Sequence, residues 1–332
     1  MRSVEAASTA VAQIKAAPCV LFAYHEIGFA CMAELLAMGA PIAALFTHDD
    51  SPGEQIWWRS CTELARAEQI PVFAPERIGD QSIAQVAAIK PEVIYSFYYR
   101  NLLPEAVLRL APRGAFNLHG SMLPKYRGRA PVNWMIANGE REAGVTLHHM
   151  VARADAGDIV AQRPVPITDD DTALTLYHKL VPVGAAIVRE CHPLIVAGRA
   201  PRRPQILADG SYFGRRRPED GRIDWKWPAR RIFNLVRAVT HPYPGAFGMI
   251  GGRKLYIWRA RIGNEAGDCG TPGAIIGPAP DTGVEVAAGE GSITLVRVQF
   301  EGEAETDAQN LFKTAMWHCP AEGANGQRWR LE

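Results

Sequence analysis

Residues 19–47 read CVLFAYHEIGFACMAELLAMGAPIAALFT and contain two apolar runs that are separated by a helical pattern. The runs at Cys19–Tyr24 and Pro41–Thr47 lack polar alternation, which is typical of strands buried on both faces of a parallel sheet. Between them, Phe29–Met38 predicts a helix that ends at Gly39. A strand, a helix and a second strand in this order predict a parallel sheet covered by helices.

The same alternation continues along the chain. Further helices are expected at 57–69, 83–89 and 103–110, and further strands at 71–74, 92–97, 114–119, 144–150 and 159–167. A long helix should run from Asp171 toward Ala197, kinked or divided at Pro182 and Pro193. The pattern predicts an α/β fold with a doubly wound, mostly parallel, Rossmann-like sheet, in which ligands bind beyond the carboxyl ends of the strands.

The composition changes after the long helix. Residues 198–222 hold seven arginines among prolines and glycines, and short strands with glycine-rich turns follow, which is typical of a small β-barrel. The expected organisation is an N-terminal extension at 1–17, an α/β domain at 18–200, a linker at 201–222, a small OB-like β-barrel domain at 223–305 and a tail at 306–332. The extension is a start-site artefact, a helix or a disordered leader, and we favour disorder.

Overall composition excludes several classes of protein. The formal net charge of +1 argues against a dedicated polyanion binder, and the six cysteines form no CxxC pair, so neither a zinc site nor a disulfide framework is indicated. No apolar run approaches the roughly 20 residues of a membrane-spanning helix. We therefore expect a cytoplasmic protein with reduced cysteines and without a bound metal.

Asn117 and His119 lie two residues apart at the end of a predicted strand, within FNLHGSMLPKYRGRAP (116–131). Successive side chains of a strand point to opposite faces of the sheet, so residues two apart share one face. A polar pair beside an aliphatic strand is costly when buried without partners, so at the carboxyl edge it should face a ligand cleft. Asp155, in VARADAG (151–157), reaches the same edge if the strand before it runs parallel to its neighbour, which the pattern leaves open.

The run NLHGS (117–121), followed by LP (123–124), YRG (126–128) and AP (130–131), resembles the signature of 10-formyltetrahydrofolate-dependent formyltransferases. Methionyl-tRNA formyltransferases and glycinamide ribonucleotide transformylases share its Asn-x-His core and distant aspartate. The resemblance covers about residues 18–300. It implies 10-formyltetrahydrofolate as the co-substrate and no metal.

Formyl transfer to an amine suits the three residue types. An amide such as that of Asn117 can donate a hydrogen bond to the oxyanion of the tetrahedral intermediate. A histidine such as His119 can take the proton of the attacking amine and protonate the leaving folate nitrogen. A carboxylate at Asp155 can orient the imidazole and favour its charged form. The resemblance gives these residues the same catalytic roles.

The resemblance also implies a folate site. Arg129 resembles a folate-contacting arginine, Val151–Asp155 resembles a folate-binding loop that acts largely through its backbone, and Asn101–Leu103 should face the pterin. The expected folate-binding residues are Asn101, Leu102, Leu103, Arg129, Val151, Ala152, Arg153, Ala154 and Asp155. The basic loop around Arg129 is either a solvated surface or a binding surface for the folate tail or a phosphate.

Within the family, four segments are most similar to the formyltransferase domain of bifunctional polymyxin-resistance proteins. They are PEVIYSFYYRNLL (91–103), NLHGSMLPKYRGRAPVNW (117–134), GVTLHHMVARADAG (144–157) and HPYPGAF (241–247). That domain formylates UDP-4-amino-4-deoxy-L-arabinose for lipid A modification, so the resemblance implies a sugar-nucleotide substrate. Because the sequence shows no decarboxylase domain, we expect formylation alone.

Other functions stay open. Methionyl-tRNA formyltransferase has the same chemistry, and the arginines at 199–217 could bind tRNA, although the near-zero net charge mildly disfavours it. A catalytically silent folate- or nucleotide-binding regulator is disfavoured by the intact Asn117, His119 and Asp155 set. A dinucleotide-binding dehydrogenase is disfavoured because YHEIG (24–28) lacks GxGxxG. His148 and His149 are neighbours on a strand and should point to opposite faces, which disfavours a joint metal site.

Overall fold

The structure is a computed structural model that describes residues 17–50, 53, 55–281, 283–316 and 330–332 of the 332-residue chain. The predicted N-terminal extension lies outside these residues except for Ala17, which is buried. The chain forms two compact units. The first contains the residues up to Pro131 together with Glu142–Pro166 and Tyr177–Phe213, and the second contains Val132–Arg141, Ile167–Leu176 and Gly214–Glu332.

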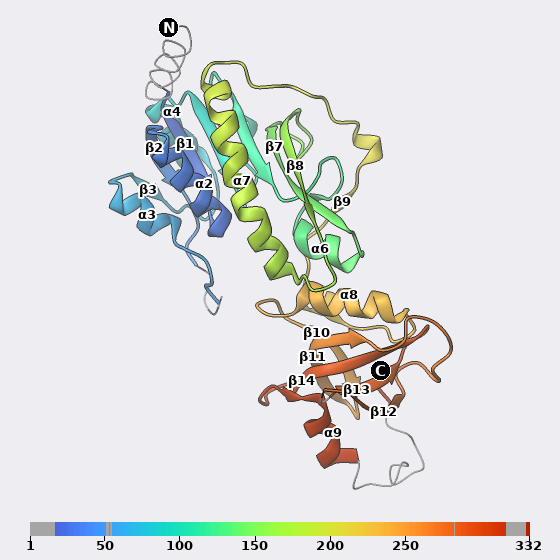
Figure 1. Cartoon of the computed structure of the whole chain (residues 1–332). Helices are drawn as coiled ribbons and strands as arrows, with labels where there is room; N and C mark the ends of the chain where they lie inside the picture. Colours follow the sequence, from blue (N-terminus) through green and yellow to red (C-terminus); the bar gives the residue numbers. More distant parts are fainter. Residues whose placement is uncertain (1–16, 51–52, 54, 282, 317–329) are drawn as a thin grey trace. The chain divides into compact units, whose positions relative to one another are not determined.

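A seven-stranded sheet forms the centre of the first unit, in the order β3-β2-β1-β4-β5-β7-β8 (Figure 1). The strands are β1 (Cys19–Ala23), β2 (Ile42–Phe46), β3 (Val72–Phe73), β4 (Val93–Phe97), β5 (Ala115–His119), β7 (Glu142–His149) and β8 (Ile159–Pro166). The first five strands in the sheet are parallel, whereas β7 pairs antiparallel with β5 and β8 antiparallel with β7. The predicted mostly parallel α/β fold is confirmed.

Helices cover both faces of this sheet. They are α2 (His25–Ala37), α3 (Cys61–Ala67), α4 (Asp80–Ile89), α5 (Glu105–Leu108) and α7 (Ala173–Val196). On one face, Val86 of α4 and Val107 of α5 pack with Phe22 and Ile94 of the sheet. On the other face, His192 of α7 bonds to Tyr95 of β4. Alternation along the strands produces this two-sided core, because successive apolar side chains point to opposite faces.

Several expected helices differ from the observed ones, and α2 begins at His25 rather than at Phe29. The helix expected at 57–69 begins only at Cys61, because the Ser60 hydroxyl accepts a hydrogen bond from the Glu63 N–H and caps the first turn. α7 is a single helix that Pro182 and Pro193 do not divide. Each proline removes one backbone donor, but the apolar face of α7 is buried, and that burial offsets the loss.

The second unit is built on an antiparallel sheet in the order β10-β11-β14-β13-β12, with β15 beside β14. Its elements are α6 (Pro131–Ala137), α8 (Ala229–Val239), β10 (Ala246–Ile250), β11 (Arg253–Ile262), β12 (Ile275–Ala279), β13 (Gly283–Ala287), β14 (Ser292–Phe300), β15 (Thr306–Asp307) and α9 (Ala308–Met316). α8 packs against β11 and β14 and buries Ile232, Leu235 and Val239. The expected small β domain after the linker is confirmed, and it is antiparallel.

The end of the chain takes part in this β domain. Met249 of β10 exchanges backbone hydrogen bonds with Glu332, and Leu331 donates to the Gly273 carbonyl just before β12. The last residues therefore lie between the two end strands of the sheet, which gives it a barrel-like closure. The described parts of the tail from residue 306 thus contribute the strand β15, the helix α9 and this closing segment.

Residues 198–213 continue from α7 without regular structure except for the short helix η1 (Leu207–Asp209) and the strand β9 (Tyr212–Phe213). β9 pairs in parallel with β6 (Arg127–Gly128). Much of the expected linker thus belongs to the first unit by its contacts. Among the described residues, no helix is long and apolar enough to cross a bilayer, and the cysteines that the structure describes are free.

Candidate active site

β5 places Asn117 and His119 on one face of the sheet, as the period of two predicts. The intervening Leu118 and the preceding Phe116 are buried on the opposite face. His119 is itself only 7% exposed, so its ring depends on protein partners for its orientation.

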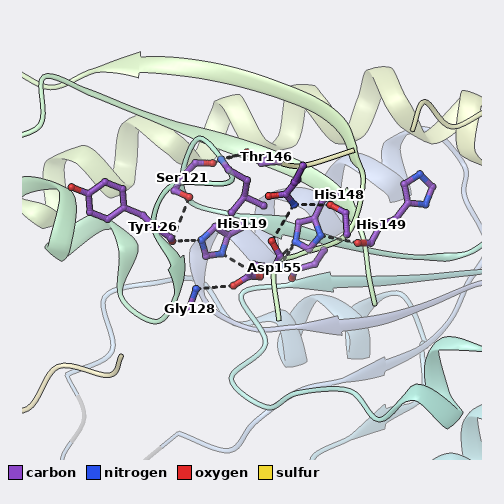
Figure 2. A network of polar contacts seen from close by, with 12 residues as sticks. His119, Ser121, Tyr126, Gly128, Thr146, His148, His149 and Asp155 are labelled. Atoms are coloured by element: carbon purple, nitrogen blue, oxygen red, sulfur yellow. Dashed lines mark hydrogen bonds and ion pairs between the residues drawn. The ribbon is translucent and has the colours of Figure 1, made fainter. Parts of the chain in front are cut away.

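The His119 ring is held at both nitrogens (Figure 2). Nε2 lies 2.7 Å from the Tyr126 carbonyl oxygen, and Nδ1 lies 3.6 Å from Oδ1 of Asp155. A carbonyl oxygen only accepts hydrogen bonds, so Nε2 carries the hydrogen. In the neutral ring Nδ1 then carries the free lone pair, and it faces the Asp155 carboxylate.

Asp155 lies at the centre of the cluster. Its Oδ2 accepts the Gly128 N–H at 2.9 Å, and its Oδ1 is 3.3 Å from Nδ2 of Asn117. Burial acts to raise the pKa of this carboxyl, but the neighbouring rings of His119 and His148 and the Gly128 N–H together hold it well below its usual value. Asp155 is therefore a fixed negative charge beside the His119 ring.

Asp155 does not reach the site at the end of a parallel strand, which was the arrangement considered from the sequence. β7 is antiparallel to β5, and His149 at its end pairs with Phe116 near the start of β5. The loop after β7 must therefore fold back across the sheet face. It does so through a left-handed residue, Asp155 (φ 52°), and through Gly157, where a Cβ atom would lie 1.9 Å from the His149 carbonyl oxygen.

His148 is a member of the cluster that the sequence reasoning did not identify. Its Nδ1 donates to the His149 carbonyl oxygen at 2.8 Å, so in the neutral ring Nε2 is the acceptor, and it lies 3.1 Å from Nδ2 of Asn117. His149 points away from the cluster (Figure 2). On the other face its ring contacts Phe116 and its Nε2 bonds to the Pro201 carbonyl. The expected opposite orientation of the two histidines is therefore found. The pairing of His148 with Asn117 across β7 and β5 leaves no local sequence signal.

The expected folate-binding residues lie on loops around the cluster. Leu102 and Val151 are large apolar side chains that are 73% and 47% exposed, whereas Leu103 is buried. Asn101 donates to the Glu76 carbonyl, and Arg129 donates to the Arg100 carbonyl at 2.8 Å, which joins the loops after β4 and β5. The rest of the expected loop shows Ala152 and Arg153 exposed and Ala154 half-buried.

The expected basic loop is not a continuous charged surface. Lys125 and Arg129 are exposed, but Arg127 is only 6% exposed. Its Nε has no hydrogen-bond partner within the described part of the chain. In those same residues, no group of three or more His, Cys, Asp or Glu side chains is arranged to hold a metal ion.

Two family models match the chain in order along its sequence. One family model, described as formyl transferase, matches residues 36–190, and a second, described as formyl transferase, C-terminal domain, matches residues 216–315. Together they span most of both units.

Solved structures share the fold at low sequence identity. An N-formyltransferase from Helicobacter canadensis in complex with folinic acid and dTDP-3-aminofucose is 22% identical, with a TM-score of 0.65 over 85% of this chain and 98% of that chain. WlaRD, a sugar 3N-formyl transferase in the presence of dTDP and 5-N-formyl-THF, is 20% identical, with a TM-score of 0.62 over 87% of this chain and 98% of that chain.

HypX from Aquifex aeolicus in complex with tetrahydrofolic acid is 18% identical, with a TM-score of 0.60 over 89% of this chain and 46% of that chain. The chain therefore spans about half the length of HypX. At these identities the solved structures show the fold alone. With both of its family models matched in order along the sequence, the chain belongs to the formyl transferase family.

Proposed function

We propose that this formyltransferase moves the formyl group of 10-formyltetrahydrofolate onto the 4-amino group of UDP-4-amino-4-deoxy-L-arabinose. The observation that carries the chemistry is the contact set of His119, Asp155 and Asn117 at the carboxyl end of β5. The folate and sugar-nucleotide ligands named for the structures of similar fold support the two substrate classes. The four segments that resemble the polymyxin-resistance enzymes favour the arabinose derivative.

In this proposal Asn117 stabilises the negative charge that develops on the formyl oxygen. Its Nδ2 faces both His148 Nε2 and Asp155 Oδ1, and these two acceptors are 3.6 Å apart. One N–H of the amide can be shared between two acceptors so close together, which leaves the second N–H for the oxyanion. A single donor of this kind typically contributes about 10² to 10³ in rate.

His119 handles the protons of the reaction. As the amine nitrogen bonds to the formyl carbon, Nδ1 of His119 takes a proton from that nitrogen. The bond between the formyl carbon and the folate nitrogen then breaks, and the same proton returns to the leaving nitrogen. Asp155 stays ionised and stabilises the transient imidazolium. Atoms and charge balance without a covalent enzyme intermediate.

10-Formyltetrahydrofolate supplies the activated formyl group when it is bound. The chain offers residues that suit it: exposed apolar side chains at Leu102 and Val151 for a flat ring, and the exposed guanidinium of Arg129 for a carboxylate tail. We assign the folate site to the loops that carry these residues.

The test is a substrate comparison. The purified protein is mixed with 10-formyltetrahydrofolate and, in separate reactions, UDP-4-amino-4-deoxy-L-arabinose, dTDP-3-aminofucose or methionyl-tRNA, and tetrahydrofolate release is followed. We expect release with the UDP-sugar and a kcat/KM for it at least tenfold above the other two.

Release with dTDP-3-aminofucose alone would keep the sugar-nucleotide class and reject the arabinose derivative. Release with methionyl-tRNA alone would keep the chemistry and move the protein to a nucleic-acid substrate, whose affinity should fall steeply with salt. Absence of release with all three acceptors, from protein shown to be folded, would overturn the proposal.

A further inference from the structure

The segment 203–213, which we call the strap, contacts both loops that complete the catalytic cluster. At its start, Arg203 and Ile159 exchange two backbone hydrogen bonds of 3.0 and 2.8 Å. At its end, β9 pairs with β6, and Phe213 stacks on Tyr126 with ring centroids 4.9 Å apart. The strap therefore connects the loop that carries Asp155 with the loop that holds His119.

Gln205 binds the turn that carries Asp155. Its Nε2 donates to the carbonyl oxygens of Asp155 at 3.1 Å and of Gly157 at 2.6 Å. Asp155 has a left-handed backbone, which costs free energy in a non-glycine residue and persists only when its surroundings hold it. Both amide hydrogens of Gln205 are used on this one turn, so the side chain fixes the backbone from which the catalytic carboxylate projects.

Ser211 and β9 bind the loop that holds His119. The Ser211 hydroxyl accepts a hydrogen bond from the Tyr126 N–H at 2.9 Å, and the Ser211 backbone carbonyl accepts one from the Arg127 N–H at 3.0 Å. Tyr126 is the residue whose carbonyl accepts from Nε2 of His119. At Gly128, whose N–H donates to Asp155, a Cβ atom would lie 2.2 Å from the Phe213 carbonyl oxygen, so the strap and this loop pack backbone against backbone.

We propose that the strap is a positioning element of the formyl-transfer site, and that Gln205 is its principal positioning residue. The inference rests on the proposed function, because it assigns the strap to the same catalytic cluster. Gln205 does not touch the reacting atoms; it acts through the backbone of Asp155. A displacement of about 1 Å in a catalytic group can lower the rate by about a hundredfold, so a clamp at this turn can have a large effect on turnover.

The sharpest test is Gln205→Glu, which keeps the shape of the side chain but turns the two donors into a carboxylate facing two carbonyl oxygens. Gln309→Glu is the matched control, since Gln309 Nε2 also donates to a backbone carbonyl, that of Ala279, within the second unit. Each variant is assayed for kcat, for the KM of both substrates and for Tm, and the ionisation of the Asp155 carboxyl is followed by ¹³C NMR.

For Gln205→Glu we expect kcat to fall between about 10- and 100-fold, with both KM values within about threefold of the wild type. In Gln205→Ala, which adds no charge, the pKa of Asp155 should rise toward its usual value, because the turn no longer holds the carboxylate against the imidazole rings and the Gly128 N–H. Gln309→Glu should leave kcat and the Asp155 pKa unchanged even where it lowers Tm. If Gln205→Glu does not fold, Gln205→Ala, which removes the donors without adding charge, should show the same pattern.

The proposal is overturned if folded Gln205 variants keep kcat within twofold of the wild type, or if Gln309→Glu lowers kcat equally. The NMR readout separates this inference from the proposed function. If the wild type transfers no formyl group to any acceptor, the proposed function fails. Even then, a raised Asp155 pKa in Gln205→Ala would show that the strap positions that residue, and an unchanged pKa would show that it does not.

Discussion

Two buried histidines lie on opposite faces of the same sheet, and their partners differ. His119 has a carboxylate beside Nδ1 and a carbonyl at Nε2. His192 has the Tyr95 hydroxyl at Nδ1, at 2.8 Å, and no partner for Nε2 among the described residues. Burial lowers the pKa of His192 to about 4, because no charge nearby compensates the lost solvation.

The difference shows what makes a buried imidazole useful for proton transfer. His192 is neutral near pH 7, and it links β4 to α7 within the core. His119 lies at the carboxyl end of its strand, and its Nδ1 is 3.6 Å from the ionised Asp155, which is the arrangement that we propose moves protons during the reaction.

The first prediction concerns His119 itself. His119→Ala should lower kcat for formyl transfer about a thousandfold, because general acid–base catalysis contributes between about 10² and 10⁴. Tyr95→Phe, which removes the hydroxyl partner of His192, should change kcat less than about threefold. Steady-state assays of tetrahydrofolate release compare the two variants. Equal losses of kcat would contradict the different roles given to His119 and His192.

The second prediction concerns the charge of Asp155. Asp155→Asn keeps the size of the side chain but removes the negative charge beside the His119 ring. We expect kcat to fall about a hundredfold with little change in KM for the sugar nucleotide, because the charge matters most when the imidazolium forms. A rise in KM at unchanged kcat would instead make Asp155 a binding residue.

The third prediction concerns His148, which orients Asn117. His148→Leu removes the acceptor at Nε2 and should lower kcat about tenfold, since the amide then has fewer contacts that set its orientation. His149→Leu is the neighbouring control on the other face and should leave kcat within twofold. The prediction fails if the two variants behave alike.

The fourth prediction concerns stability and pH. The unfolded chain protonates His192 near pH 6.5, whereas the folded chain does so only near pH 4. The unfolded state therefore binds more protons in this window, and the free energy of unfolding should fall as the pH drops from 6.5, by about 3 kcal/mol at pH 4.

A double variant, Tyr95→Phe with His192→Leu, should flatten this dependence, since it removes both partners together. It should not abolish the dependence, because burial also lowers the pKa of His25, to about 3. Urea unfolding at several pH values measures the effect. An unchanged slope between pH 6.5 and 4 in the double variant would show that His192 is not its source.

Local patterns in the sequence predicted the parts of the molecule that depend on near neighbours. The apolar runs of β1, β2 and β4 mark buried strands, and the spacing of Asn117 and His119 gives their shared face. The family resemblance then placed Asp155 with them, and the structure brings all three together.

The remaining features depend on long-range pairing that no local pattern contains. The antiparallel direction of β7 puts His148 opposite Asn117, and the strap meets loops about 50 to 85 positions away in the sequence. The arginines and prolines of 198–222 gave this stretch the composition of a linker. Its function comes instead from Gln205 and Ser211, which stand out only once their partners are known.

If Asp155 acts through His119, the losses caused by removing the two residues should not multiply, and a double-mutant cycle measures this. The kcat of formyl transfer is measured for the wild type, His119→Ala, Asp155→Asn and the double variant. If the two residues act as a unit, the double variant should be no slower than His119→Ala alone, because a carboxylate without its imidazole has nothing to support. If the two losses instead multiply, Asp155 acts independently of His119, and the account of the site given above is wrong.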